Sequence, residues 1–326
     1  MVTAIEPLLR EQLIDRRQRL ETATSAFQRP AELTRLLAEV DAALHRMDVG
    51  TYGLCEVCHD PVEPERLLAD PLTRFCLGDL TPREQRALEE DLELASQIQA
   101  GLLPPPKQQI DGWEVSYHYQ PAGAVSGDYC DLIKGEDQSL HFALGDVSGK
   151  GVAASMLMAH LNAMFRTLIS INLPLEQMME RASRVFCEST LPTQYATLVC
   201  GRATNDGDVE VCNAGHLPPL VIQRGEVTSI AATGLPVGVF CSETFAVNRI
   251  HMSKGDTLFL YTDGLSESLD GAGNEYGAER LSQLLNDNRE LATDSMISLC
   301  RQELHSFAEG RVPRDDLTLM AIRRTK

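Results

Sequence analysis

The sequence predicts an α+β fold for most of the chain, preceded by a helical, cysteine-containing segment. Two observations lead to this prediction. Apolar residues recur at helical spacing before residue 48, and strand-like segments alternate with helical ones after residue 106. With 326 residues, of which 43% are hydrophobic and 23% charged, the chain is long enough for a catalytic domain and a smaller module.

The first predicted element is a helical hairpin. Helical spacing runs from about Ile5 to Phe27 and again from about Ala31 to Met47, with Pro30 marking the turn between them. Residues 48–50 (Asp-Val-Gly) end this pattern, and a cysteine-containing segment follows from Tyr52 to about Leu80. We therefore expect two antiparallel helices that lead into a small module.

A third helix is predicted from Thr81 to Leu103. Thr81 is suited to the N-cap position, Pro82 to the first helical position and Glu84 to the capping-box position. The prolines at 104–106 end the predicted helix. Its apolar stripe has a gap, because Gln99 lies where a fifth apolar residue would be expected. Two heptads leave open whether the helix forms a coiled coil or packs on its own domain. The stripe is formed by Leu88, Leu92, Ala95 and Leu102.

Strands and helices alternate after these prolines. Residues 113–119 alternate between apolar and polar, and Tyr195–Arg202 and Val209–Asn213 are rich in β-formers, with a Gly/Asp turn at 205–208 that predicts a hairpin. The remaining segments have helical spacing, namely Val152–Ile171, Leu175–Ser189, Ala278–Asn286 and about Asp294–Ala308.

Charge and composition narrow the function classes. A formal net charge of −18 argues against nucleic acid or an anionic membrane as the main partner, since both need a basic surface. The start, MVTAIEPLLREQL, has acids where a signal peptide would have a basic region, so we expect a cytoplasmic protein. The apolar stretch Ser155–Leu175 is interrupted by His160, Asn162 and Arg166, which predicts a buried helix and no membrane span.

The nine cysteines predict reduced thiols with a possible metal cluster, and no disulfide framework. Six of them lie in no cysteine-phosphatase setting, so we expect them to be small buried hydrophobic residues. These six are Cys130, Cys187, Cys200, Cys212, Cys241 and Cys300.

Four aspartates border apolar strand-like segments. Asp128 lies in VSGDYCD, Asp146 and Asp263 follow predicted strands, and Asp315 precedes one. A single Asp beside Gly is usually a turn residue. Four acids that each border a strand can instead meet at one edge of a sheet.

Such acids would repel one another by several kcal/mol unless protons or cations neutralised them. All-oxygen ligation favours Mg²⁺ or Mn²⁺, and two ions about 3.5–4 Å apart can hold a water for attack on phosphorus. The glycines around Asp146 let the backbone turn, so that its carboxylate and the carbonyl of Val147 can face one ion. Asp131 and Asp316 are predicted to be structural, although either could exchange roles with the neighbouring Asp128 or Asp315. We assign no catalytic role to Lys150 or Glu267.

His216 is ambiguous from the sequence. A loop histidine near a metal site can transfer protons, but a structural hydrogen bond is the more common role.

The cysteine segment contains Cys55-x-x-Cys58, seventeen intervening residues and then Cys76-x-x-Asp79. This is zinc-ribbon spacing with Asp79 in the place of a fourth cysteine. Either Asp79 or His59 could complete the site. A metal-free remnant, or a weak and redox-sensitive site, is the alternative.

Six ordered motifs between Asp91 and Ile322 closely resemble the SpoIIE/RsbU branch of metal-dependent PPM (protein phosphatase 2C-like) serine phosphatases. They are SGDYCD, ALGDVSGKGVAASMLM, NAGHLPPL, TGLPVGV, LYTDGLSES and DDLTLMAI. The resemblance implies two antiparallel sheets flanked by helices on both sides, with two Mn²⁺ or Mg²⁺ ions at one edge. It also implies that the substrate is a phosphorylated anti-sigma-factor antagonist of the STAS type.

Carried over residue by residue, the resemblance gives Asp146 the bridging position between the two metals. Asp128 and the carbonyl of Val147 would complete one metal, and Asp263 and Asp315 would hold the other. Asp146 and Asp263 are accordingly the residues we expect to be indispensable for catalysis.

Residues from about Ile5 to Leu94 resemble the DksA/TraR zinc-finger family, whose helix also enters the finger through a Gly-Thr-Tyr-Gly segment (residues 50–53). The chain differs from that family at Asp79 and at the hairpin tip, where residues 25–32 lack paired aspartates.

The sequence thus predicts a regulatory module at 1–80, a linker helix at 81–106 and a phosphatase domain at 107–326. We expect a serine/threonine phosphatase that is controlled by its N-terminal module and forms a homodimer through the linker helix. Two alternatives stay open: an RNA polymerase-binding protein with an accessory phosphatase domain, and a zinc or redox sensor that gates the phosphatase.

Overall fold

A computed structural model describes residues 2–26, 30–77, 82–311 and 314–326 of the chain. The chain divides into two compact units, Met1–Leu94 and Ala95–Lys326, and the boundary falls inside helix α4 (Pro82–Leu102). Each unit has its own apolar core. The two units are described separately below.

The first unit is built on the predicted helical hairpin. Helices α1 (Val2–Ala26) and α2 (Pro30–Asp48) pack on each other, and a short helix, α3 (Pro64–Ala69), follows. Two ion pairs join the hairpin helices, Arg10–Asp48 at 2.6 Å and Arg17–Asp41 at 2.8 Å. The core of this unit includes Leu9, Leu13, Val40, Cys55 and Cys76.

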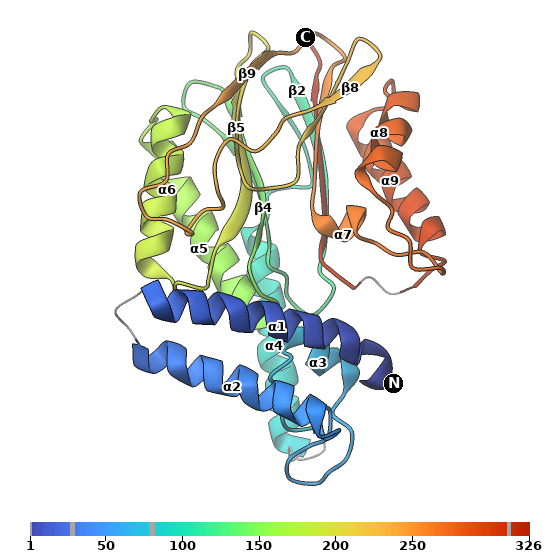
Figure 1. Cartoon of the computed structure of the whole chain (residues 1–326). Helices are drawn as coiled ribbons and strands as arrows, with labels where there is room; N and C mark the ends of the chain where they lie inside the picture. Colours follow the sequence, from blue (N-terminus) through green and yellow to red (C-terminus); the bar gives the residue numbers. More distant parts are fainter. Residues whose placement is uncertain (1, 27–29, 78–81, 312–313) are drawn as a thin grey trace. The chain divides into compact units, whose positions relative to one another are not determined.

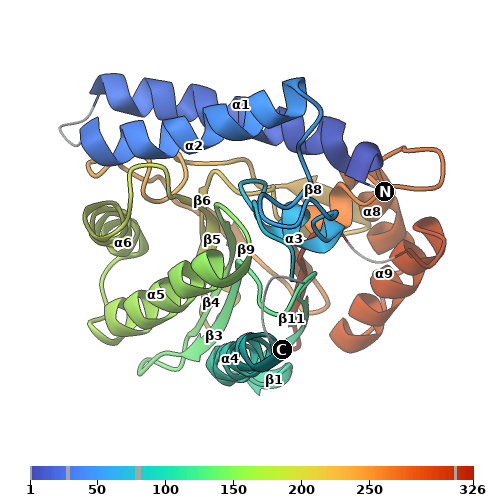
Figure 2. The same cartoon turned by 90° about the horizontal axis from the view of Figure 1, so that it is seen from below.

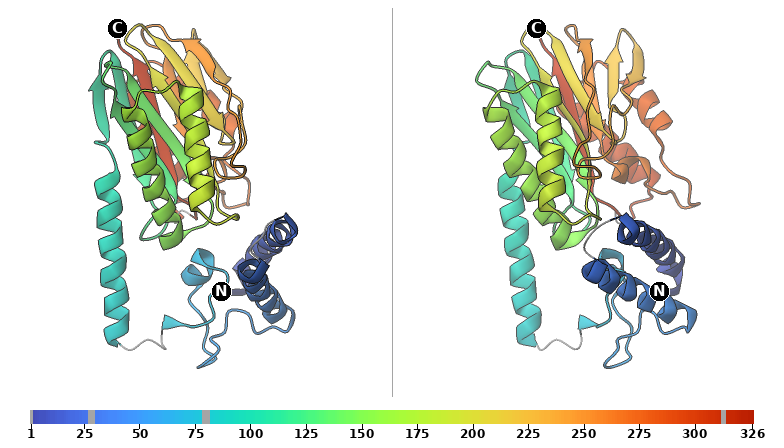
Figure 3. Two further views of the ribbon diagram at one scale, coloured as in Figure 1. Left: turned by 90° about the vertical axis from the view of Figure 1, so that its left-hand side faces the viewer. Right: turned by 60° about the vertical axis from the view of Figure 1, so that its left-hand side comes forward.

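The second unit contains two antiparallel sheets that face each other (Figures 1 and 3). The six-stranded sheet has the order β1-β2-β11-β10-β7-β8, and the five-stranded sheet has the order β3-β4-β5-β6-β9. The strands of the first sheet are β1 (Lys107–Ile110), β2 (Trp113–Gln120), β7 (Leu220–Gln223), β8 (Glu226–Ser229), β10 (Thr257–Tyr261) and β11 (Leu317–Arg324). Those of the second are β3 (Asp128–Lys134), β4 (Leu140–Val147), β5 (Ala196–Ala203), β6 (Asp208–Ala214) and β9 (Asn248–His251).

Helices cover the outer face of each sheet, as Figure 2 shows from below. Helices α5 (Gly151–Ser170) and α6 (Leu175–Ser189) share a core with the five-stranded sheet. Helices α8 (Ala278–Asp287) and α9 (Thr293–Phe307) share another with the six-stranded sheet. The predicted α+β sandwich of two antiparallel sheets between helix layers is therefore confirmed.

Most predicted elements are observed within one or two residues of their expected ends, including the β5–β6 hairpin. Thr81, the predicted cap of α4, lies outside the described residues. Helix α5 has the length and the apolar composition that a membrane-spanning helix needs, but 44% of its apolar stretch is buried within the protein. It packs on β3, β4 and α6, as expected of a core helix.

Two cysteines depart from the prediction of unpaired thiols. Cys187 of α6 and Cys241 of the segment between β8 and β9 form a disulfide, with their Cα atoms 5.3 Å apart. The same segment exchanges backbone hydrogen bonds with β5, between Val237 and Ala196. Because 54 residues separate the two cysteines, their pairing depends on tertiary structure and has no local signal. The prediction was wrong for this pair.

The other cysteines of the second unit agree with the prediction. Cys130, Cys200, Cys212 and Cys300 are buried free thiols. Burial raises the pKa of each of them, to about 11 for Cys212 and about 12 for Cys300. A raised pKa suppresses the thiolate that a nucleophile would need, so all four act as small apolar residues.

Phe142 of β4 gives a direct test of the core between the sheets. Its side chain is 1% exposed and lies against Gly201, its cross-strand partner on β5, which leaves no room for a Cβ there. We expect Phe142→Ala to lower the free energy of unfolding by about 3–5 kcal/mol, because it removes an aromatic ring from a close-packed core. The fluorescence of Trp113, which is 1% exposed in the same core, reports the denaturant midpoint of this unit.

The matched control is Phe240→Ala, since Phe240 is 55% exposed. We expect it to change the free energy of unfolding by no more than about 0.5 kcal/mol. Equal midpoints for the two variants would contradict the assignment of the core.

Candidate active site

The four predicted acids are held at the ends of strands from both sheets. Asp128 opens β3 and Asp146 is the penultimate residue of β4, and the two are direct cross-strand partners. Asp263 opens the short helix α7 (Asp263–Ser266), just after β10, and Asp315 lies two residues before β11. Since β10 and β11 are antiparallel neighbours, the end of one lies beside the start of the other. The fold therefore brings these acids to one edge of the sandwich.

Asp128 is the most deeply buried of the four, with 1% of its surface exposed. The hydroxyl of Thr318 donates to its Oδ2 atom, and that of Thr262 does so at 3.1 Å. Burial, and then the charge of Asp146, raise the pKa of Asp128 well above its usual value. Thr318 of β11 and Thr262, the residue after β10, thus fix the orientation of this carboxyl group.

Asp146 and the carbonyl of Val147 border the same space beside Gly127. A Cβ atom on Gly127 would lie 3.2 Å from the Val147 carbonyl oxygen and 3.3 Å from Asp146 Oδ1. Glycine at this position keeps both oxygens accessible. Burial, followed by the charges of Asp263 and Asp315, raises the pKa of Asp146 well above its usual value.

Asp263 is placed by a close backbone approach. The next residue, Gly264, lies so near the Asp316 carbonyl that a Cβ there would overlap it, so the Asp-Gly pair reflects packing between α7 and the start of β11. Burial, then the charges of Asp315 and Glu267, raise the pKa of Asp263 to about 6. Lys150 acts in the opposite direction.

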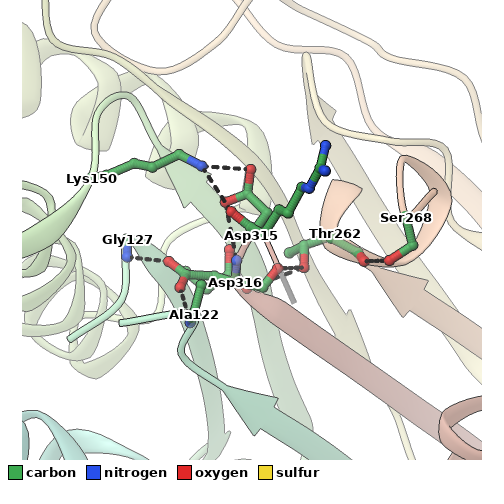
Figure 4. A network of polar contacts seen from close by, with 10 residues as sticks. Ala122, Gly127, Lys150, Thr262, Ser268, Asp315 and Asp316 are labelled. Carbon is green, nitrogen blue, oxygen red and sulfur yellow. Dashed lines mark hydrogen bonds and ion pairs between the residues drawn. The ribbon is translucent and has the colours of Figure 1, made fainter. Parts of the chain in front are cut away.

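The two neighbouring aspartates 315 and 316 have different contacts (Figure 4). Asp315 Oδ2 accepts a hydrogen bond from Lys150 Nζ at 2.9 Å. The Asp316 carboxylate accepts from the backbone amides of Ala122 at 2.7 Å and Gly127 at 2.9 Å. Asp316 therefore holds the segment before β3 in place, whereas Asp315 pairs with Lys150, and the charges of both raise the pKa of Asp146.

Asp131 lies apart from this cluster. It is three residues after Asp128 on β3, which puts its side chain on the opposite face of the strand. There it accepts two hydrogen bonds from Arg166 of α5, each 2.9 Å long, and a third from Asn162. This carboxylate joins α5 to the sheet.

The cluster has the chemistry of a site for hard divalent cations. Its side chains that could bind a metal are all carboxylates. Burial and the charges of neighbouring acids raise the pKa of Asp128, Asp146 and Asp263. Such a group of acids is stable only when it takes up protons or cations. Oxygen ligands of this kind suit Mg²⁺ or Mn²⁺, so the residues present fit the predicted ions.

Comparison with known proteins gives the family. A family model described as Stage II sporulation protein E (SpoIIE) matches residues 136–325, more than half of the chain. The chain belongs to the SpoIIE family. A second model, the prokaryotic dksA/traR C4-type zinc finger, matches residues 50–78.

Individual relatives support this SpoIIE-family assignment. Protein IcfG of a Synechocystis strain is 26% identical over 72% of this chain, and the chain spans 41% of its length. Phosphoserine phosphatase RsbU of Bacillus subtilis is 24% identical over 74% of this chain and 72% of its own length. The SiaA-PP2C domain of Pseudomonas aeruginosa has the same fold, with a TM-score of 0.65 at 17% identity, covering 73% of this chain and 97% of that domain.

The zinc-finger match coincides with a cluster of three sulfurs in the first unit. The Sγ atoms of Cys55, Cys58 and Cys76 all lie within 4.8 Å of one another. Cys55 and Cys76 are buried, whereas Cys58 is exposed. The fourth predicted ligand, Asp79, lies outside the described residues. Three thiols at this spacing fit a tetrahedral zinc ion that takes one further ligand.

Gln99 explains the gap in the apolar stripe of α4. Its side chain is 5% exposed and makes two hydrogen bonds with the backbone of Ser126, Nε2 to the carbonyl at 2.7 Å and Oε1 from the amide at 2.9 Å. Ser126 in turn accepts from the amide of Asp128 through its hydroxyl. The linker helix of this SpoIIE-family chain is thereby tied to the segment that positions Asp128.

Several residues of the site escaped the sequence analysis. Thr262 and Thr318 gave no signal, because their role depends on two strands from distant parts of the chain. Gln99 did give one, since a polar residue in an apolar stripe indicates a buried hydrogen bond. Glu267, one helical turn beyond Asp263, was noted in the sequence without a role. Its charge raises the pKa of Asp263, and its own pKa is raised by burial and by Glu275.

His216 is a structural residue of the site. Its imidazole is 6% exposed, Nε2 donates to the carbonyl of Tyr261 at 3.1 Å, and Nδ1 accepts from the hydroxyl of Thr197 at 2.8 Å. Burial lowers its pKa to about 4. It therefore joins the ends of β5 and β10 as a neutral group.

This geometry predicts a pH-dependent loss of stability. Because the folded pKa of His216 lies below 6.5, the unfolded chain binds the proton more tightly, and the contribution of His216 to stability falls as the pH drops from 6.5 towards 4. We expect the stability difference between the wild type and His216→Gln to shrink by about 2 kcal/mol between pH 7.5 and pH 5. Denaturation at both pH values measures it, and a constant difference would contradict a buried neutral imidazole.

Proposed function

We propose that this chain is a metal-dependent protein phosphatase that hydrolyses phosphoserine or phosphothreonine on a protein of a partner-switching pathway. The single observation behind this proposal is the cluster of strand-end acids at one edge of a SpoIIE-family sandwich. The relative RsbU is a phosphoserine phosphatase, which supports the reaction class. We infer a STAS-type anti-sigma-factor antagonist as substrate and a cytoplasmic location from the same family resemblance.

The acids would hold two Mg²⁺ or Mn²⁺ ions. We assign the bridging position to Asp146, which lies between its strand partner Asp128 and the acids of the other sheet. Asp128 and the Val147 carbonyl would serve one ion, and Asp263 and Asp315 the other. Bound ions of this kind lower the pKa of a water molecule and neutralise charge on phosphoryl oxygens.

The protein's own contribution is orientation and support. Thr262 and Thr318 hold the Asp128 carboxyl group, Asp316 holds the backbone at Gly127, and His216 joins the strand ends behind Asp146. A water molecule held between the acids would then lie in line with an incoming phosphoryl group. No side chain needs to form a covalent intermediate.

Catalytic dependence on the acids is directly testable. Asp146→Asn and Asp263→Asn should each lower Mn²⁺-dependent hydrolysis of an aryl phosphate by about 100-fold or more, since each removes a charged metal ligand. The control is Asp206→Asn, an exposed acid in the β5–β6 turn that should retain activity. Full activity in both site variants would rule out this assignment.

We further propose that the N-terminal unit regulates the phosphatase. The route would be α4, because Gln99 connects this helix to Ser126 and Asp128. Helix α4 also carries exposed apolar side chains at Leu88, Leu94 and Ile98, with exposed fractions of 40%, 54% and 59%. These suit a second copy of the helix, so the proposal includes a homodimer formed through α4.

Zinc binding at the cysteine cluster can be measured separately. Elemental analysis of the purified chain should find about one zinc ion per chain, because three thiolates and one further ligand complete a tetrahedral site. Cys76→Ala should lose the zinc, whereas Cys300→Ala, which alters a buried thiol of the second unit, should keep it. Zinc content that is equal in the two variants would count against a zinc site here.

A further inference from the structure

Lys150 lies beside the acid cluster, and the proposed metal site gives it no role. It lies between Gly149 and Gly151 in the turn from β4 to α5, and its side chain is 38% exposed. Both glycines have positive φ values, +102° and +70°, which other residues rarely adopt, and Lys150 between them has an extended backbone. Figure 4 shows its side chain directed towards Asp315.

The charge of Lys150 acts on the whole cluster. Its Nζ atom lies 2.9 Å from Asp315 Oδ2 and 3.4 Å from the Arg314 carbonyl oxygen. It lowers the pKa of Asp146, Asp263 and Glu267, opposing the burial and the acidic neighbours that raise them. Among the described residues, it is the cation that these three carboxyl groups share.

A phosphorylated substrate needs cations at this point. The chain has a net charge of −18, and the edge of the sandwich presents several carboxylates, so an approaching phosphate dianion is repelled. Cations bound to the acids would balance the negative charge of Asp315 in place of Lys150. The ammonium group of Lys150 would then be free of its carboxylate and could turn to a second anion.

There is room for such an anion beside the turn. A Cβ atom on Gly149 or on Gly151 would meet no atom within 4 Å. The first residues of α5 are also open, since Val152 is 46% exposed and Met156 is 69% exposed. A phosphoprotein segment can therefore approach Lys150 from solvent.

We propose that Lys150 binds the phosphoryl group of the substrate, exchanging Asp315 for a phosphate oxygen when the acids are occupied by metal. This inference rests on the proposed phosphatase function and adds a substrate-binding residue to it. An ammonium group suits the task, because it forms charge-assisted hydrogen bonds with phosphate oxygens.

Inorganic phosphate, the product of the reaction, is the probe. Its affinity for the Mn²⁺-loaded full chain is measured by calorimetry for the wild type, Lys150→Met and Lys150→Arg. We expect Lys150→Met to weaken phosphate binding by about tenfold and Lys150→Arg to restore most of it, as the loss of one charge-assisted hydrogen bond predicts. Lys254→Met, which removes an exposed lysine before β10, should bind phosphate as the wild type does.

Mn²⁺ affinity of the same variants separates the alternatives. If Lys150 only neutralises the acids, Lys150→Met will bind Mn²⁺ differently but phosphate within about threefold of the wild type, and the proposal is overturned. If phosphate binding falls while Mn²⁺ binding is kept, the proposal holds. Phosphate binding can be measured even if the wild-type protein shows no hydrolysis. Absence of hydrolysis would refute the phosphatase function, whereas unchanged phosphate binding in Lys150→Met would refute the role of Lys150.

Discussion

Repulsion between carboxylates at one edge of the sandwich is the constraint on which the rest of the active-site structure depends. Burial raises the pKa of Asp128, Asp146 and Asp263. The charges of Asp146 and Asp263 raise the pKa of Asp128 further, and the charge of Asp263 raises that of Asp146. In a medium of low polarity such a group costs several kcal/mol unless cations balance it. The surrounding structure holds the acids together against this cost, which makes the site ready to bind divalent cations.

The supporting contacts come from both sheets and from the linker helix. Thr318 of β11 and Thr262, which follows β10, orient Asp128 of the five-stranded sheet, and Asp316 fixes the backbone at Gly127. Gln99 connects α4 to the same segment through Ser126. A displacement of α4 would therefore act on the position of Asp128, and this connection is the physical basis of the proposed control by the N-terminal unit.

Charge also explains why one lysine matters in so acidic a protein. Lys150 pairs with Asp315, and its charge lowers the pKa of Asp146 and Asp263. The same ammonium group is suited to a phosphate once that partner is taken. Lys150 in the turn between β4 and α5 would thus pair first with an acid of the cluster and then with the phosphoryl group of the substrate.

The sequence by itself determined the α+β class, most of the helices and the acids that border strands, because periodicity and turn glycines are local signals. The two-sheet sandwich was implied by the family resemblance of its ordered motifs. The sequence also flagged Gln99 as a polar residue in an apolar stripe. Only the tertiary structure showed which partners Asp315 and Asp316 contact, gave His216 its two hydrogen bonds, and paired Cys187 with Cys241. Those outcomes depend on contacts between residues distant in the chain, and no local pattern encodes which partner a side chain meets.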